Sequence, residues 1–407
     1  MKILLSWLNE YGDFGDPTDA DAVQRVADAL TSLGLEVDAI EAIGETVDGV
    51  VTARILRLEA HPDAAKVQRV YVDVGDGNER HVWCGASNIS ADDIVPLATL
   101  GTTMPNGMTI ERRGILGIDS EGMLCSAQEL GLGEDHSGIR VLPAGTALGL
   151  PYGDALGIDP DVLIDADVTR NRPDCWGYVG IARDLAAKMG VEFRPPTPGL
   201  KVDGEERTTP VELVDGERCS RFTSTVISGV AVGESAEWMQ RRLTAAGMRP
   251  ISNVVDVSNY VMLELNQPNH AYDLDTLGGG GFRVRLATDG EHLVTLDGED
   301  RTFSTNDLLI CDANDVPIGV GGIMGGLDSE ISDATTTVAL EMAWFELVGI
   351  GRTVTRTGLR SEASQRFERG VDPYGMPTAV ARFVELLEET CPDLVVHSGA
   401  ADARSED

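Results

Sequence analysis

Apolar residues recur at helical spacing in several parts of the chain. Between residues 18 and 33, Val23, Val26 and Leu30 fall on one face, and Gly34 follows as a stop signal. This pattern predicts a helix. Comparable patterns predict further helices at residues 180–189, 236–246, 361–369 and 377–390.

Residues 46–143 have a different pattern, with short runs of β-branched residues separated by turns. Val70, Val72 and Val74 alternate with polar neighbours, and the turn at residues 75–78 (Gly-Asp-Gly-Asn) follows. Short strands at this spacing predict a small β-barrel.

The second half of the chain mixes both patterns. A strand is predicted at 221–230, and further strands at 282–302 are joined by turns at Asp289-Gly290 and Asp297-Gly298. The Pro-rich stretch 194–199 reads as a linker and domain boundary. An α+β architecture is therefore expected after it.

Composition limits the function classes. The chain has 407 residues, 42% of them hydrophobic, so it should fold into two or three domains. Lys and Arg number 32 against 67 Asp and Glu, a net charge of −35, which by itself argues against a nucleic-acid partner and favours a small-molecule enzyme. No signal-peptide core and no apolar run of membrane-spanning length is seen, so we expect a cytoplasmic, soluble protein.

The six cysteines offer no metal site. They lie far apart in the sequence and contain no C-x-x-C pair, so neither a zinc site nor a compact disulfide framework is expected. We expect reduced and mostly buried thiols.

Two glycine clusters, at 278–281 and 319–326, do not fit nucleotide binding. The second is followed by an acidic, turn-like segment instead of a helix, and the Gly-Lys-Ser/Thr ending of a P-loop is absent. Such glycines would suit the close approach of backbone to a bulky ligand in a pocket.

Two polar residues stand near these glycines in the expected sheet. A lone histidine such as His270, in a turn-rich stretch, is usually structural. Glu341 falls on the same strand face as Thr337 and Ala339, so it could line a pocket or be a solvated edge residue, and the pattern leaves both open.

The most basic window of the chain is residues 351–370, with five arginines against two glutamates. Part of this charge is intrahelical pairing, since Glu362 and Arg366 are four residues apart. The remaining arginines could bind phosphate groups.

Ordered motifs carry a family resemblance. AHPDAAKV (60–67), WCGASN (83–88), VPLA (95–98), MPNG (104–107) and SEGMLCS (120–126) resemble the tRNA-binding OB-fold domain fused to several synthetases. The rest resembles the β-subunit family of bacterial phenylalanine-tRNA synthetases, through MKILLSWLNEY (1–11) and the segments 168–187, 249–275, 321–326 and 358–373.

The resemblance implies an α+β multidomain fold. A β-barrel OB-fold tRNA-binding domain (40–150) would be inserted in a small N-terminal α/β domain (1–39 plus 151–200). An α+β editing domain (210–375) would follow, and then a closing helix and truncated C-terminal linker (376–407).

The implied function is that of the β chain of an (αβ)₂ ligase that uses ATP and Mg²⁺ to attach phenylalanine to tRNA(Phe), with adenylate chemistry on the α subunit. The editing domain would hydrolyse Tyr-tRNA(Phe). Editing is needed because an apolar pocket shaped for phenylalanine cannot strongly reject tyrosine, which only adds a hydroxyl group.

The resemblance also implies roles for individual residues. His270 and Asn259 would position the ester and its attacking water, and Glu341 would accept a hydrogen bond from the tyrosine hydroxyl. Asn269, where the family usually has leucine, would make the wall beside His270 more polar and loosen selectivity. Further pocket residues implied are Ser258, which stands where the family often has threonine, and Gly319, Gly321, Gly322, Gly325 and Gly326.

Recognition of tRNA by so acidic a chain must rest on local arginines and RNA shape. We therefore expect weak and strongly salt-sensitive binding. The candidate residues are Arg54, Arg57, Lys66, Arg69, Arg112 and Arg113 in the barrel, and Arg352, Arg356 and Arg360 beside the editing domain.

Family β chains continue far beyond residue 407, so an N-terminal portion is expected. The parts that carry most of the α-subunit interface and the magnesium ligands would be missing, so no cofactor is expected on this segment and no ligation by it alone. A free-standing trans-editing hydrolase and a non-catalytic tRNA-binding module are the alternatives. The pocket residues count against the second alternative.

Overall fold

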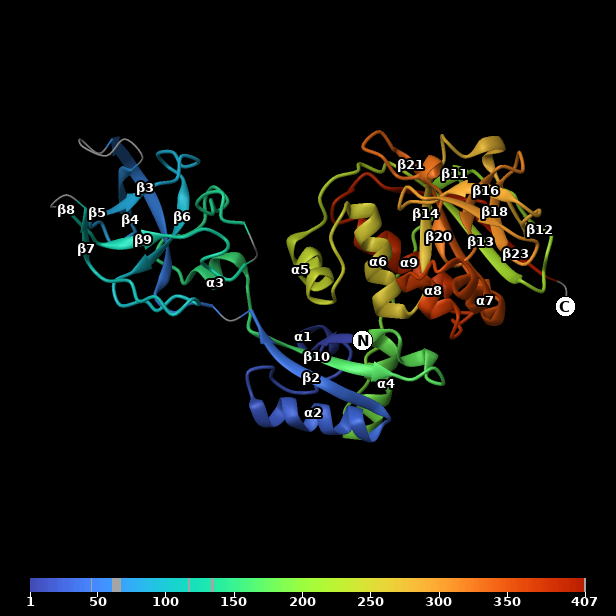
Figure 1. The fold of residues 1–407 in the computed structure, drawn as a ribbon, viewed down its shortest axis with the longest axis horizontal. Helices are drawn as coiled ribbons and strands as arrows, with labels where there is room; N and C mark the ends of the chain where they lie inside the picture. The colour runs from blue at the N-terminus through green and yellow to red at the C-terminus, as the bar shows by residue number, and fades with distance from the viewer. Residues whose placement is uncertain (45, 61–66, 116–117, 133–134, 406–407) are drawn as a thin grey trace. The chain divides into compact units, whose positions relative to one another are not determined.

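The computed structural model describes residues 1–44, 46–60, 67–115, 118–132 and 135–405, which form two compact units (Figure 1). One unit consists of Met1–Glu41 and Val162–Asp407, and the other, Ala42–Asp161, is inserted between these segments. Among the described residues, no helix has the length and apolarity needed to cross a membrane.

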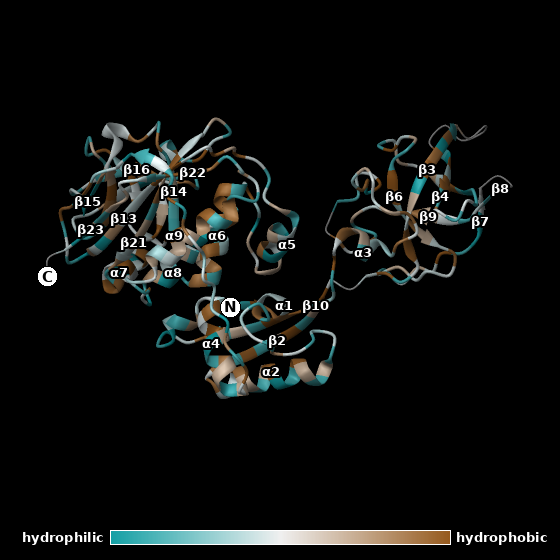
Figure 2. Cartoon of the chain, turned by 180° about the vertical axis from the view of Figure 1, so that it is seen from behind, coloured by the Kyte–Doolittle hydropathy of each residue, from teal (hydrophilic) through white to brown (hydrophobic). Residues whose placement is uncertain are grey.

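The first unit begins with a three-stranded sheet in the order β1-β10-β2. The predicted helix is present as α2, where the Asp19 side chain caps the N-terminus and Val23, Val26 and Leu30 are buried. Figure 2 shows hydrophilic and hydrophobic residues alternating along α2. The bounds are β1 Lys2–Leu4, α1 Leu5–Leu8, α2 Ala20–Ser32, β2 Leu35–Ile43, β10 Asp161–Val168, the 3₁₀ turn Pro173–Cys175 and α4 Tyr178–Met189.

Two larger sheets form the rest of this unit. The first has the order β11-β22-β13-β21-β14, with β23 also paired to β13, and the second has the order β12-β15-β18-β19-β20. The strands of the first sheet are β11 Gly204–Glu206, β13 Cys219–Ser228, β14 Asn269–Asp273, β21 Thr337–Phe345, β22 Val395–Ser398 and β23 Ala401–Arg404. Those of the second are β12 Val211–Leu213, β15 Phe282–Leu286, β18 Leu308–Asp312, β19 Pro317–Val320 and β20 Met324–Gly325, and β16 Glu291–Val294 pairs with β17 Asp300–Phe303 beside them.

The two sheets share one apolar core. Phe222 of β13 and Tyr272 of β14 both pack against Phe282 of β15, with ring centroids 5.3 and 5.1 Å apart. Side chains on the inner faces of both sheets are therefore removed from water, which makes any polar group among them conspicuous.

Five helices accompany these sheets in the described residues. α6 packs on β14 and on α9, while α7 and α8 contact each other. The Glu346 side chain caps α7 by accepting from the amides of Val348 and Gly349. The bounds are α5 Glu237–Ala245, α6 Asn253–Leu265, α7 Leu347–Thr357, α8 Glu362–Phe367 and α9 Met376–Leu387, and short 3₁₀ turns lie at Gly278–Gly280 and Leu327–Ser329.

The end of the chain differs from the prediction. We predicted a closing helix followed by a linker, but α9 is followed by β22 and β23, which both pair antiparallel with β13. These strands have four residues each and gain their stability from a partner about 170 to 180 positions earlier, which no local pattern reveals.

Aromatic stacking joins the N-terminal segment to the later part of the same unit. Trp7 stacks between Tyr178 of α4 and Tyr260 of α6, with centroid distances of 3.8 and 4.3 Å. The separation of residues 1–39 and 151–200 as a domain distinct from 210–375 stays a prediction. Residues 1–39 and 162–200 belong to the same compact unit as 210–375 here, and residues 151–161 belong to the inserted unit.

The inserted unit is a five-stranded, nearly closed barrel with the strand order β5-β4-β3-β6-β9. The Glu121 amide donates to the His81 carbonyl (2.9 Å) and the Trp83 amide to the Ser120 hydroxyl (3.3 Å), which connects the two ends of the sheet. Its elements are β3 Val50–Ala60, β4 Gln68–Asp73, β5 Arg80–Cys84, β6 Ile94–Thr99, β7 Arg113–Ile115, β8 Ile118–Ser120, β9 Gly122–Leu124 and α3 Tyr152–Leu156.

Candidate functional site

His270 and Glu341 form a directly opposed pair on neighbouring strands. β14 and β21 run antiparallel, with His270 in register with Glu341. Side chains opposed in this way share one face of the sheet with Cβ atoms about 5 Å apart. The face is the inner one, because Tyr272, Ala339 and Ala343, at alternate positions, belong to the core between the sheets.

Glu341 is a buried carboxylate, with only 5% of its surface exposed. The alternative of a solvated edge residue is wrong, because β21 lies between β13 and β14. The Tyr272 hydroxyl donates a hydrogen bond to Glu341 Oε2 at 2.8 Å, and no described group donates to Oε1. Burial raises the pKa of Glu341 to about 7, against the lowering effect of the Tyr272 hydrogen bond.

His270 presents an unsatisfied ring nitrogen. Its Nε2 is buried without a hydrogen-bond partner among the described residues, although the residue as a whole is half-buried. Burial lowers the pKa of His270 to about 4, so the imidazole is neutral at pH 7. Its ring meets that of Tyr272 edge-on, with centroids 4.4 Å apart. A buried polar atom without a partner costs stability, so it marks a position for water or a ligand.

Two of the five predicted glycines border this pair. A Cβ on Gly325 would lie 2.7 Å from Cε1 of His270, and one on Gly319 would lie 3.4 Å from the Tyr272 hydroxyl. These glycines let the β19–β20 backbone approach the two rings. The other three, Gly321, Gly322 and Gly326, face mainly the core or neighbouring backbone instead.

Asn269 does not line the wall beside His270, and that prediction is wrong. Its side chain extends to the other side of β14, where Nδ2 donates to the Ser258 carbonyl on α6 at 3.1 Å. The reason is the two-residue alternation of strand β14, which sends neighbouring side chains to opposite faces. Ser258 faces the same junction, and its hydroxyl donates to the Asn269 carbonyl at 3.1 Å.

Asn259 follows Ser258 on α6 and is half-buried. Its side chain hydrogen-bonds to none of the described residues, so the structure neither joins it to His270 nor engages it elsewhere. The residue that sequence reasoning missed is Tyr272. The alternation of His270 and Tyr272 on one strand was the available signal.

The arginines of the basic window separate into two groups. Arg366 is buried and pairs with Glu362 at 2.8 Å, as its spacing predicted. Arg352, Arg356 and Arg360 are exposed and line one groove of about 510 Å³ together with Arg170, which sequence reasoning did not single out.

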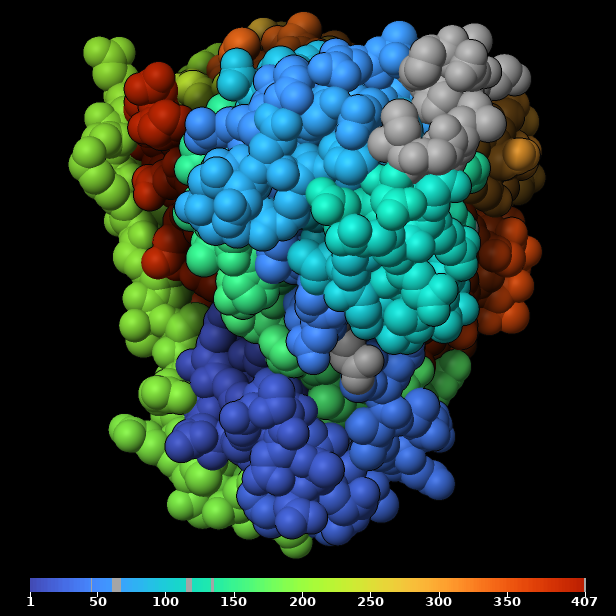
Figure 3. Space-filling model, turned by 90° about the vertical axis from the view of Figure 1, so that its left-hand side faces the viewer, coloured from blue at the N-terminus to red at the C-terminus, as the bar shows by residue number. Residues whose placement is uncertain are grey.

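The barrel arginines lie beside aromatic rings on the outer face of the sheet. The Arg57 guanidinium stands 3.5 Å above the Tyr71 ring, and that of Arg69 is 4.9 Å from Tyr71 and 6.0 Å from Trp83. Arg57 also forms an ion pair with Glu79. The residues of the barrel are coloured blue to green in Figure 3.

The remaining candidate residues of the barrel differ in whether they form ion pairs. Arg54 and Arg113 are exposed and form no ion pair with a described residue, whereas Arg112 lies 3.5 Å from Glu121. Lys66 lies outside the described residues.

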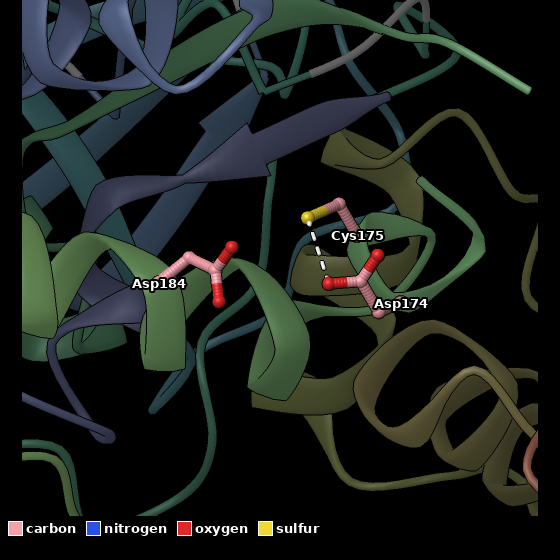
Figure 4. Close-up of side chains that lie close together, drawn as sticks. All are labelled: Asp174, Cys175 and Asp184. Atoms are coloured by element: carbon pink, nitrogen blue, oxygen red, sulfur yellow. Dashed lines mark hydrogen bonds between the residues drawn. The ribbon is translucent and has the colours of Figure 1, made fainter. Parts of the chain in front are cut away.

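One cluster has the composition of a metal site. Asp174, Cys175 and Asp184 bring two carboxylates and a thiol together near α4 (Figure 4). The Arg172 guanidinium donates to all three side chains, and Arg183 pairs with both carboxylates, so two fixed positive charges already balance the cluster. Burial also raises the pKa of the Cys175 thiol to about 12, which disfavours a thiolate ligand. All six cysteines are buried and free, as predicted.

Two protein-family descriptions match separate parts of the chain. Residues 50–151 match the family described as a putative tRNA binding domain, and residues 218–392 match the B3/4 domain.

The phenylalanine–tRNA ligase β subunit of Anaeromyxobacter dehalogenans is 46% identical over 407 residues, which are 100% of this chain and 50% of the relative. That of Nitratidesulfovibrio vulgaris is 43% identical over 389 residues, 95% of this chain and 48% of the relative. The chain spans about half the length of the curated relatives it matches. A crystal structure of an N-terminal fragment of the Pyrococcus horikoshii phenylalanyl-tRNA synthetase β subunit covers 49% of this chain and 62% of its own, with 14% identity and a TM-score of 0.27.

Proposed function

Because the chain belongs to the phenylalanine–tRNA ligase β-subunit family, we propose that it is the portion of such a subunit that binds tRNA and removes mischarged tyrosine. The observation that supports editing most strongly is the opposed pair of His270 and Glu341 between two sheets, each with a polar atom that the described residues leave open.

Glu341 supplies the selectivity in this proposal. Tyr272 holds Oε2, so Oε1 accepts the phenolic hydroxyl of a bound tyrosyl group. A phenylalanyl group offers no donor and leaves the buried Oε1 atom without a hydrogen bond. The site therefore favours the ester that carries the extra hydroxyl, the reverse of what an apolar pocket can do.

His270 and Asn259 position the reacting groups. A neutral imidazole has one nitrogen that donates and one that accepts, so it can hold a water molecule against the ester carbonyl. Attack by water breaks the bond between the acyl carbon and the ribose oxygen, releasing tyrosine and a free tRNA 3′ hydroxyl group. Gly319 and Gly325 leave room for the substrate beside the two rings.

We assign the barrel to the OB-fold class. With β3, β4, β5, β6 and β9 as its first to fifth strands, the order is 3-2-1-4-5 and the third strand meets the fifth, as in a five-stranded Greek-key barrel. The arginines and aromatic rings on the outer face of β3, β4 and β5 suit RNA, because bases stack on both kinds of side chain.

The complete ligase would use ATP and Mg²⁺ and would pair with an α subunit. We place no Mg²⁺ on this chain, because the carboxylate and thiol cluster found among the described residues is already paired with Arg172 and Arg183. Ligation would then require the α subunit and the second half of the β subunit, in an (αβ)₂ assembly.

The test is hydrolysis of Tyr-tRNA(Phe) by the protein as it is encoded, together with its α subunit. Loss of a hydrogen bond to a charged acceptor costs about 1.5–3 kcal/mol, so Glu341→Ala should lower kcat/KM by about 10- to 100-fold. Loss of the histidine that positions water should cost about 100-fold in His270→Ala.

Glu234→Ala is the matched control, since it removes an exposed carboxylate of the same unit and should hydrolyse at the parent rate. If both pocket variants also keep the parent rate, the pocket is wrongly assigned.

A further inference from the structure

The groove beside α7 is a concentration of positive charge in an acidic protein. Four arginines (Arg170, Arg352, Arg356 and Arg360) and one glutamate, Glu368, line it, for a net charge of +3 in a chain of −35. Figure 1 shows α7 and α8, which flank it, side by side.

The nearby carboxylates neutralise these arginines only in part. Arg356 donates to the buried Asp307 carboxylate. Glu368 is buried and shared among three guanidinium groups, those of Arg360 (3.1 Å), Arg369 (3.0 Å) and Arg170 (3.7 Å). Arg352 forms no ion pair with any described residue. A surplus of positive charge therefore faces solvent.

The helix dipole does not account for the cluster. Cations are favoured in the last turn of a helix, which explains Arg356 on α7. Arg170 comes from the turn after β10, however, and Arg360 lies beyond the end of α7. Separate segments converge on this groove, as expected for a binding surface.

The shape and chemistry suit a nucleotide chain. Arg352 and Arg356 are four residues apart on α7, so a rise of about 6 Å along one helix face separates their positions. Leu347 and Val348 at the rim are 41% and 48% exposed. Phosphates can thus meet guanidinium groups while ribose or base surfaces meet apolar side chains.

One loop connects the helices beside the groove with the pair of His270 and Glu341. Gly322 packs against Ile350 of α7 and Phe367 of α8, and the Ser361 hydroxyl donates to the Ile323 carbonyl at 2.6 Å. Three residues after Gly322, Gly325 packs against the His270 ring. Three residues span at most about 11 Å, so this short segment joins the buried side of the helices that carry the groove to the His270 ring.

We propose that this groove binds phosphates of the single-stranded 3′ end of the tRNA whose ester enters the pocket of His270 and Glu341. The inference rests on the proposed editing function. It adds an anchor for the strand, so that binding energy away from the ester fixes the position of the reacting bond.

The test is Arg352→Glu, since Arg352 is exposed and forms no ion pair with a described residue, so its replacement should leave the fold intact. In the protein with its α subunit, kcat/KM for Tyr-tRNA(Phe) should fall about 10-fold or more, mainly through KM, and less so as salt is raised. Tyrosyl-adenosine lacks the upstream phosphates, so the ratio of kcat/KM for Tyr-tRNA(Phe) to kcat/KM for tyrosyl-adenosine should fall by a similar factor. Arg352→Lys should restore most of the lost kcat/KM.

Arg25→Glu is the control for charge alone, because Arg25 is exposed on α2 away from the groove. Equal losses on tRNA and tyrosyl-adenosine, or no loss on tRNA, would overturn the proposal. Unchanged Tyr-tRNA hydrolysis with weaker subunit association would also overturn it, and would show that an acidic protein segment occupies the groove.

A binding measurement separates this proposal from the editing function. A short labelled RNA with the tRNA 3′ sequence should bind the Arg352→Glu variant more weakly than the parent protein. If the variant binds this RNA more weakly but the parent protein does not hydrolyse Tyr-tRNA(Phe), the editing proposal is contradicted and the groove proposal is supported. If the variant binds this RNA as the parent does, the groove proposal fails.

Discussion

At the scale of single residues, the pocket depends on how two ionisable groups respond to burial. Glu341 and His270 are opposed on one sheet face, and the same loss of water raises the pKa of the carboxyl group to about 7 and lowers that of the imidazole to about 4. Near neutral pH the histidine is therefore uncharged, while Glu341 changes between its neutral and charged forms.

This makes tyrosine selectivity dependent on pH. Above pH 7 the Glu341 carboxylate is charged and accepts a stronger hydrogen bond from the tyrosyl hydroxyl, by about 1 kcal/mol. The ratio of Tyr-tRNA to Phe-tRNA hydrolysis should thus rise about three- to fourfold between about pH 6 and pH 8. Measuring the ratio in the parent protein and in Glu341→Gln isolates this effect, and an equal rise in both would contradict it.

The contribution of Glu341 to folding stability changes with pH in the opposite direction. A carboxyl group whose pKa is raised in the folded state contributes stability below its unfolded pKa of 4.5, and this is lost as pH rises through about 7. Glu341 therefore costs the fold stability under the conditions in which it selects best, as expected of a functional residue.

At the scale of elements, α6 is the support on which β14 lies. It is joined to α9 by Glu264, which is fully buried and receives Arg382 through Nε (2.8 Å) and Nη2 (3.0 Å). The Tyr11 hydroxyl also donates to Glu264, so one carboxylate connects three separate segments of the chain. Its full set of partners offsets the cost of burying the charge.

Removing one partner of Glu264 should reveal the free-energy cost of burying its charge. Arg382→Ala leaves Glu264 buried without its counter-charge and should lower the free energy of unfolding by about 3–5 kcal/mol. Urea denaturation followed by tryptophan fluorescence would measure it. The double variant Glu264→Gln/Arg382→Met should recover most of the loss.

Lys201→Ala is the comparison, because its ion pair with Asp203 is exposed and should contribute nothing measurable. A similar midpoint for Arg382→Ala and Lys201→Ala would mean that the buried pair does not hold α6 and α9 together.

At the scale of the whole molecule, net charge and RNA binding must be reconciled. The total of −35 argued against a nucleic-acid partner, yet the arginines are unevenly distributed. Several gather in the α7 groove and on the outer barrel face, although some of these, such as Arg356 and Arg57, are themselves paired with carboxylates. Binding must therefore be local, against a repulsive background.

This predicts weak, strongly salt-sensitive tRNA binding. If the chain neutralises about three phosphates, affinity should fall about 40-fold between about 50 and 200 mM salt. A salt titration of tRNA binding checks this. Replacing Arg54 and Arg113, which form no ion pair with a described residue, by alanine should reduce the slope, whereas tight binding that ignores salt would contradict the prediction.

The sequence determined the local elements and the family. Helical periodicity located α2 and α9, alternation located β4 and β21, and ordered motifs pointed to the β-subunit family, because these signals depend on neighbouring residues. Tertiary structure decided the rest: that Glu341 lies on a central strand, that Tyr272 occupies one of its oxygens, that Asn269 faces α6, and that β22 and β23 complete the sheet. Burial and partners depend on contacts between residues far apart in the chain, and no local pattern specifies which strand becomes the neighbour of which.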